Sequence, residues 1–253
     1  MSKEQFLYPG TVQLLKTLDE AAHRGGISRG QTFDDFLHMT VCALAGGQME
    51  DQYLAVVKKH TEGAKGRRSC DSLARLFGQL VDRMEQTRQD ILGDLFQGAI
   101  TYGEAGQYLT PDSICKLMAQ VTVNGNEVEH KSHRTVCDPC SGSGRMLLAV
   151  ADIQPHWEFV GQDVDVRCVR MTAINLALRN LYGYAVWGNS LTMEQKVIYR
   201  TGFNLRGFIR EISIEECPEP LRQIAAEPPP SPIDAPETDK AIKPSGGHQL
   251  RLF

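Results

Sequence analysis

The sequence has no excess of positive charge and no long apolar run. Its formal net charge is −4 over 253 residues, so no overall positive field is available to attract a nucleic acid. Any contact with DNA is therefore expected to be weak, or to come through a partner. No stretch is apolar enough to cross a bilayer, and residues 1–5 lack the basic-then-apolar pattern of a secretory leader. We therefore expect no membrane contact.

The cysteine pattern does not indicate a disulfide framework. There are 7 cysteines, an odd number, without the spacing of a disulfide-bonded scaffold. Free thiols in such numbers are typical of a reducing compartment. Since no leader is found either, we expect a cytoplasmic protein.

The first part of the chain has the pattern of packed helices. Apolar residues recur at helical spacing through residues 11–88, for example at Phe33, Phe36 and Leu37. We expect an all-helical N-terminal domain over residues 1–94.

The last part, residues 216–253, is rich in proline and poor in large apolar side chains. Such a segment cannot bury enough surface to offset the entropy that ordering would cost. We expect it to be a flexible, extended tail.

Residues 95–215 alternate between strand and helix patterns, which favours an α/β fold. The stretch from Thr135 to Val150 indicates a strand, a glycine-rich turn and a helix. A second predicted strand ends at Asp163, roughly twenty residues after the turn. That is the spacing at which a Rossmann-type unit places an acid on ribose hydroxyls.

Further elements follow this unit. The pattern predicts a helix over residues 165–180 and a third strand over 184–191. Two alternating segments, 196–200 and 208–214, are predicted to pair as a hairpin because glycines lie between them.

Four short motifs occur in a fixed order: G-x-Y-x-T-P at residues 106–111, D-P-x-x-G-S-G at 138–144, G-Q-D at 161–163 and G-N-S-L at 188–191. In this order the chain resembles the modification subunits of type I restriction-modification systems and related adenine-N6 DNA methyltransferases. The resemblance covers residues 95–191. It implies a shortened, Rossmann-like, S-adenosylmethionine-dependent methyltransferase domain behind the helical one. S-adenosylmethionine is then the expected cofactor and DNA the expected substrate.

The resemblance also implies a cofactor site. Asp163 is expected to accept hydrogen bonds from the ribose hydroxyls, and Asp138 to orient the methionine chain or its amino group. The glycines of the turn let the main chain approach that moiety, and Asn189 stands where many relatives carry an aspartate facing the adenine. The full predicted site is Tyr108, Thr110, Pro111, Asp138, Pro139, Gly142, Ser143, Gly144, Asp163 and Asn189.

Two other interpretations of these residues are weaker. A dinucleotide site would need the third glycine of G-x-G-x-x-G, which is missing here. A zinc site at His130, His133, Cys137 and Cys140 would leave only residues 134–136 between the two ligand pairs, where the strand must run straight. No metal is expected.

The catalytic motif of the family is missing. Relatives carry Asn/Asp-Pro-Pro-aromatic after a fourth strand, where it accepts hydrogen bonds from the target amine and stacks on the flipped base. After Leu191 the nearest match, residues 227–230, has no aromatic side chain and lies in the tail. No catalytic residue is therefore assigned; the amine-binding group would come from Asn204, from Asn189 or from another chain.

Two hypotheses follow. The chain is either a shortened DNA adenine methyltransferase, or a non-catalytic S-adenosylmethionine-binding regulator or assembly partner. A filled space at residues 193–208, in place of a base-sized pocket beside the methyl group, would favour the second.

The C-terminal peptide suggests how either protein reaches DNA. Its Q-L-x-L-F pattern resembles the peptide by which bacterial replication and repair proteins dock on the sliding clamp. The expected partner-binding residues are Gln249, Leu250, Leu252 and Phe253. A tethered peptide with aliphatic and aromatic anchors would hold the folded part near DNA.

Overall fold

A computed structural model of the chain describes residues 6–101, 108–123, 134–204 and 207–217. The peptide at residues 249–253 and the proline run at 227–230 lie outside these residues, as do His130 and His133. The interpretations that involve them stay predictions.

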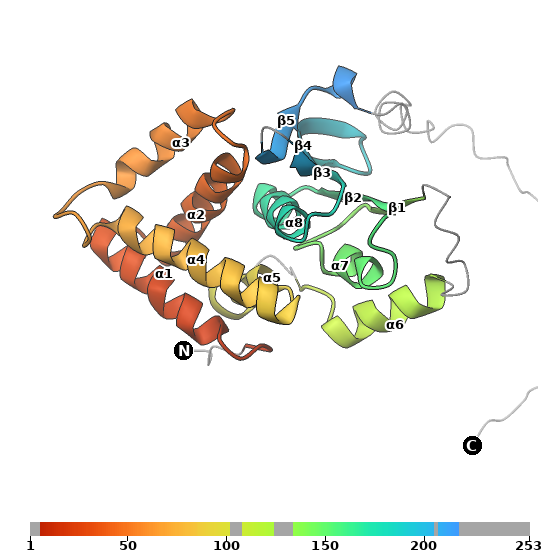
Figure 1. Ribbon diagram of the computed structural model, residues 1–253, viewed down its shortest axis with the longest axis horizontal. Coiled ribbons are helices and arrows are strands. Elements are labelled where there is room, and N and C mark those ends of the chain that lie inside the picture. Colours follow the sequence, from red (N-terminus) through yellow and green to blue (C-terminus); the bar gives the residue numbers. More distant parts are fainter. Residues whose placement is uncertain (1–5, 102–107, 124–133, 205–206, 218–253) are drawn as a thin grey trace, which may run out of the picture.

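The amino-terminal part consists of helices, as the apolar spacing predicted. They are α1 (Thr11–Gly25), α2 (Arg29–Leu44), α3 (Glu50–Val57), the short η1 (Lys58–His60) and α4 (Ser69–Thr87). Helix α1 packs along α4, and α2 crosses behind them (Figure 1). The predicted stripe residues Phe33, Phe36 and Leu37 of α2 are fully or almost fully buried.

Three short elements connect these helices to the sheet: α5 (Ile91–Leu95), the π-helical η2 (Phe96–Thr101) and α6 (Asp112–Thr122). The domain boundary expected after residue 94 thus falls inside α5.

Helix α5 also fixes the start of the described chain. The carboxylate of Asp94 accepts hydrogen bonds from the backbone N–H of Leu7 at 2.8 Å and of Tyr8 at 3.1 Å, and from the hydroxyl of Thr11 at 2.6 Å. Because Asp94 is buried, these bonds satisfy a charge that water cannot reach.

The remaining elements form an α/β unit. They are β1 (Thr135–Asp138), α7 (Arg145–Ala151), β2 (Glu158–Asp163), α8 (Val166–Leu178), β3 (Gly183–Asn189), β4 (Glu194–Asn204), β5 (Gly207–Ile212) and the short η4 (Ile214–Glu216). The sheet has 5 strands in the order β1-β2-β3-β4-β5.

The strands pair in two ways. β1, β2 and β3 run parallel, joined by crossovers through α7 and α8, as a Rossmann-like unit requires. β4 runs antiparallel to β3, and β5 antiparallel to β4. The structure therefore confirms both the strand–helix alternation and the hairpin predicted from residues 196–214.

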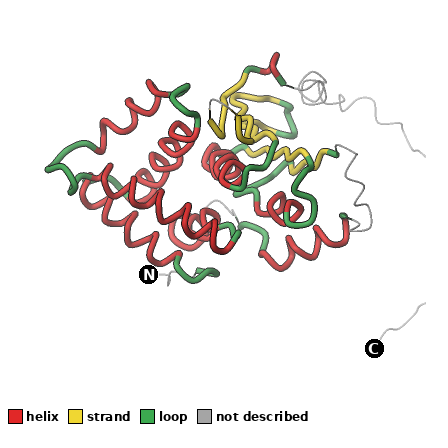
Figure 2. The backbone as a smooth tube through the Cα atoms, viewed as in Figure 1, coloured by secondary structure: helices red, strands yellow, loops and turns green. Residues whose placement is uncertain are grey.

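One apolar core joins the helical part to the sheet. Helix α8 lies between them and packs on β3, β4 and β5 on one side and on α2 on the other. Phe33 and Phe36 from α2 belong to the same buried cluster as Ile174 of α8 and Ile209 of β5. Figure 2 shows helices α1–α4 on one side of the molecule and the strands, together with α6 and α7, on the other.

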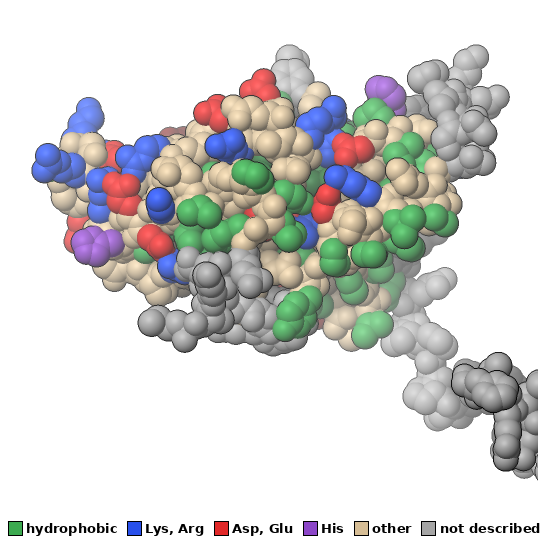
Figure 3. All heavy atoms as spheres, turned by 90° about the horizontal axis from the view of Figure 1, so that it is seen from below, with side chains coloured by type: hydrophobic (Ala, Val, Ile, Leu, Met, Phe, Trp, Pro, Cys, Tyr) green, Lys and Arg blue, Asp and Glu red, His purple; other side chains and the backbone are tan. Residues whose placement is uncertain are grey.

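Strand β1 lies at the sheet edge, and Thr135 and Cys137 are exposed there. Helix α6 packs on α7 through Cys115 and Ala119 but leaves an apolar face outside. Figure 3 shows apolar side chains on this part of the surface. Those exposed on α6 are Ile114, Leu117, Met118 and Val121.

Among the residues that the structure describes, no helix combines the length and the apolar character that crossing a bilayer requires.

Candidate cofactor site

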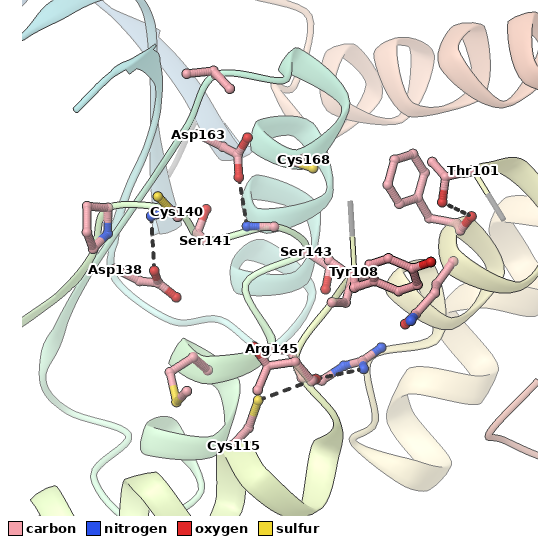
Figure 4. A pocket seen from close by; sticks show the side chains of 18 of the residues that line it. Thr101, Tyr108, Cys115, Asp138, Cys140, Ser141, Ser143, Arg145, Asp163 and Cys168 are labelled. Carbon is pink, nitrogen blue, oxygen red and sulfur yellow. Dashed lines mark hydrogen bonds between the residues drawn. The ribbon is translucent and has the colours of Figure 1, made fainter. Parts of the chain in front are cut away.

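A cavity of about 420 Å³ opens beside the carboxyl ends of β1 and β2. This is the edge at which parallel α/β sheets bind ligands, and the volume falls within the roughly 300–1,000 Å³ of small-molecule sites. Figure 4 shows the side chains that surround it. The lining residues are Phe96, Gln97, Thr101, Tyr108, Leu109, Thr110, Cys115, Asp138, Pro139, Cys140, Ser141, Gly142, Ser143, Arg145, Met146, Asp163, Val164, Cys168 and Ser190.

The glycine-rich turn between β1 and α7 forms one wall. Gly142 has φ +55°, in the left-handed region that favours glycine, and an added Cβ would lie 2.6 Å from Leu109 Cδ2. The missing side chain therefore leaves room where the turn faces the loop before α6. Gly144, with φ +83°, packs instead against Thr172 of α8, 3.1 Å from the position of a Cβ.

Asp163 ends β2 and points at this turn. Its Oδ2 accepts the backbone N–H of Gly142 at 2.9 Å, and its Oδ1 accepts that of Asp165 at 2.9 Å. Each carboxylate oxygen can accept more than one hydrogen bond, so both can also receive ligand hydroxyls. Burial raises the pKa of Asp163 above its usual value, and the two backbone hydrogen bonds oppose this.

Asp138 ends β1 on the other side of the turn. Its Oδ1 accepts the backbone N–H of Cys140 at 3.1 Å. Burial raises the pKa of this carboxyl too. Two partly desolvated carboxylates thus flank the turn, a favourable setting for ribose hydroxyls at one and an ammonium group at the other.

A buried carboxylate that the sequence gave no reason to select holds the turn in place. Asp90, at the N-cap of α5, accepts the hydroxyl of Ser143, the Nε–H of Arg145 at 2.9 Å and the side-chain amide of Asn175 at 2.9 Å. It also accepts the backbone N–H of Gly93 at 2.9 Å. All four side chains are at most 4% exposed, so the helical part, the turn and α8 meet at one charged group.

Gly93 is required by this arrangement. A Cβ there would lie 2.0 Å from Asp90 Oδ2 and 2.5 Å from Ser143 Oγ. No side chain therefore fits between α5 and the turn.

The π-helical segment η2 supplies another wall that the sequence pattern did not reveal. Phe96, Gln97 and Thr101 line the cavity from it. Six residues are too few to show a helical period, and π-helical turns recur at functional sites. The aromatic ring of Phe96 stacks on Phe33 and lies under the Arg167 guanidinium, which holds it in place.

The structure brings most of the predicted cofactor residues together. Tyr108, Thr110, Asp138, Pro139, Gly142, Ser143 and Asp163 all line the cavity.

The other three lie outside the lining. Pro111 and Gly144 cap helices α6 and α7. Asn189 turns its amide oxygen to the backbone N–H of Leu191 at 2.9 Å, while its neighbour Ser190 reaches the cavity.

Asn204 is corrected as a candidate for amine binding. Strand β4 pairs Glu194 with Asn189 and Thr201 with Gly183. Its last residue, Asn204, therefore lies beyond the amino end of β3. This is the end of the strands opposite the cavity. The region 193–208, considered above as a wall of a base pocket, is mainly a hairpin.

Cys137 and Cys140 are free, exposed thiols. The described residues contain no cluster of three metal-ligating side chains.

The cavity, the turn and the acid after the second strand define a class of site. The fold is a Rossmann-like α/β unit behind an all-helical N-terminal region. The family model of N-6 DNA Methylase matches residues 87–208. Residues 87–208 are therefore similar to members of that family.

Two solved structures are similar at a greater distance. The methyltransferase subunit of a type I restriction-modification system from Streptococcus thermophilus shares 16% identity over 68% of this chain and 56% of that one, with a TM-score of 0.34. A protein of Listeria monocytogenes described as a class I S-adenosylmethionine-dependent methyltransferase shares 16% identity over 69% and 51%, with a TM-score of 0.39. The chain thus spans about half the length of each. A search of curated proteins gives no match.

The raised pKa of Asp163 predicts that both ligand affinity and folding stability depend on pH. Ribose hydroxyls would donate to the ionised carboxylate, so affinity for S-adenosylhomocysteine is expected to fall as pH is lowered through that raised pKa. Stability follows the opposite sign: the folded chain holds this proton more readily than the unfolded one, so the carboxyl favours folding at low pH and opposes it as pH rises.

Calorimetric titrations between pH 7.5 and 5 measure this dependence. The Asp163→Asn variant, which has no titratable group there, should bind more weakly and keep only the dependence due to Asp138. An unchanged pH profile in that variant would contradict the assignment to Asp163.

Proposed function

We propose that this chain binds S-adenosylmethionine in the cavity beside the glycine-rich turn. The observation that carries the proposal is the joint position of Asp163 and the Gly142 turn, hydrogen-bonded to each other at the mouth of two parallel strands. An acid held there by backbone N–H groups is ready to receive vicinal hydroxyls without reorganising.

The lining residues suit such a cofactor from end to end. Asp163 receives the ribose, with Val164 and Ser190 beside it on the side of the adenine. Asp138 faces the ammonium group of the methionine chain, and Thr110 borders that end. When bound, S-adenosylmethionine supplies an electrophilic methyl group.

We further propose adenine in DNA as the methyl acceptor, on the strength of the family match to residues 87–208. The chain's own contribution is then to hold the cofactor, while DNA contact is weak or shared with a partner, since the net charge is −4.

A second candidate function is supported by the path of the chain after β3. It turns directly into β4, antiparallel to β3, and then into β5. Of the described strands after β3, β4 ends in Asn204, which lies away from the cavity, and β5 is followed by Ser213. This favours a non-catalytic S-adenosylmethionine-binding regulator or assembly partner.

The cofactor proposal is tested by titrating the protein with S-adenosylhomocysteine. Replacing Asp163 by alanine should weaken binding by about tenfold or more, because each hydrogen bond to a charged group contributes roughly 1.5–3 kcal/mol. Asp51→Ala removes an exposed acid from α3 and serves as the charge-matched control. Absence of binding heat with the unmodified chain, or equal losses in both variants, would refute the proposal.

Methyl transfer separates the two candidate functions. The isolated chain should give little or no N6-methyladenine in duplex DNA with tritiated S-adenosylmethionine, because nothing described in the chain accepts hydrogen bonds from the amine. The measurement is nucleoside analysis of the product, with a known adenine methyltransferase as positive control. Robust turnover would eliminate the non-catalytic candidate.

Recruitment to DNA is proposed from the sequence alone. A labelled peptide of residues 242–253 should bind a bacterial sliding clamp in fluorescence anisotropy, because Leu252 and Phe253 supply the apolar anchors. A double Leu252→Ala, Phe253→Ala peptide is the control, and equal binding of both peptides would count against the proposal.

A further inference from the structure

Arg145, the first residue of α7, combines burial with an unused hydrogen-bond donor. It is 4% exposed, and among the described residues that line the cavity it is the only cation. In the described part of the chain, no acceptor lies within hydrogen-bond distance of its Nη2. A buried donor without an acceptor is unfavourable, and an oxygen of a bound ligand would satisfy it.

The rest of the guanidinium is held rigidly. Nε donates to Asp90 Oδ2 at 2.9 Å, and Nη1 donates to the carbonyl of Thr110 at 3.1 Å. Ser143 and Asn175 donate to the same Asp90 carboxylate. Since Asp90 is shared among several donors, Arg145 keeps capacity for a second acceptor, and its planar group suits a carboxylate.

The position of Arg145 fits one end of the cofactor. Figure 4 shows Asp163 in the upper part of the site and Arg145 in the lower part, with Ser143 between them and Asp138 to one side. A ligand whose ribose lies on Asp163 extends its amino-acid chain towards Arg145. Its ammonium group then meets Asp138 and its carboxylate meets Arg145, so that each charge of the zwitterion faces its opposite.

We propose that Arg145 is the residue that recognises the carboxylate of the cofactor's amino-acid end. The inference rests on the proposed function, because it assigns a subsite within the same cavity. It assigns this subsite to a side chain outside the motif residues predicted from the sequence.

A purely structural role for Nη2 is the alternative that the experiment has to test. Arg145 borders a second, polar cavity of about 90 Å³ beside Asp112 and Lys116. Water held there would satisfy the nitrogen without any cofactor. The experiment therefore has to separate carboxylate recognition from a structural role.

Two ligands make that separation. S-adenosylhomocysteine carries the amino-acid end, whereas 5′-methylthioadenosine has the same nucleoside and thioether without it. Arg145→Gln should lower the affinity for S-adenosylhomocysteine about tenfold more than it lowers the affinity for 5′-methylthioadenosine. The ratio of the two affinities, measured calorimetrically, is the readout, and a general loss of structure does not change it.

Two further variants complete the design. Arg145→Lys keeps the charge beside Asp90 but removes Nη2, so it should show a smaller selective loss and remains usable if Arg145→Gln does not fold. Lys116→Gln removes a half-exposed cation from the small cavity and should leave both affinities unchanged.

The outcomes are distinct. If S-adenosylhomocysteine and 5′-methylthioadenosine weaken by the same factor, or neither weakens, Arg145 does not recognise the carboxylate while the cofactor site stands. If neither ligand binds the unmodified chain, the proposed function itself fails.

Discussion

The buried ion pair between Asp90 and Arg145 is the interaction on which the site depends. Asp90 is the N-cap of α5, and Arg145 is the first residue of α7, 55 positions later. Their bond fixes the glycine-rich turn from behind, through Ser143, and locks α8 to it through Asn175. Removing one partner of such a pair leaves an uncompensated buried charge, at a cost of about 3–5 kcal/mol.

Stability alone does not account for this pair. Apolar residues of similar volume are often as good as a buried ion pair or better, and a fully apolar contact would also hold α5 against the turn. A charged, hydrogen-bonded cluster does something that an apolar contact does not, because it fixes the orientation of the turn's donors and acceptors. The polar cluster therefore serves to fix the geometry of the glycine-rich turn.

The sequence contained much of the fold because the relevant signals are local. Glycines at 142 and 144, an acid at 163 and the alternating segments after residue 194 each specify their own turn or strand, and the structure confirms those elements. The domain boundary was harder to place, since the helices and the sheet share one core through Phe33, Ile174 and Ile209. Contacts between elements do not alter the spacing of apolar residues within one element, so the sequence pattern does not reveal them.

The site was predictable where motifs were contiguous, and not where it was assembled by tertiary contact. Asp138 and Asp163 follow strands, so their place at the cavity could be anticipated. Asp90 is a single carboxylate before a five-residue helix, and nothing local separates it from an ordinary N-cap. Asn204 has a suitable residue type for binding an amine. The antiparallel register, however, places it beyond the amino end of β3, away from the cavity.

The cysteines in the cavity wall have a practical consequence for detecting occupancy. Cys115 and Cys168 are buried there, and burial raises the pKa of Cys115 to about 11 and that of Cys168 further. Cys140 is exposed at the same wall, on the glycine-rich turn. Since alkylating reagents need an accessible thiolate, Cys140 is the thiol of this wall that they reach first. A molecule seated on the turn would shield it, so the chain contains a natural chemical reporter of whether its cavity is filled.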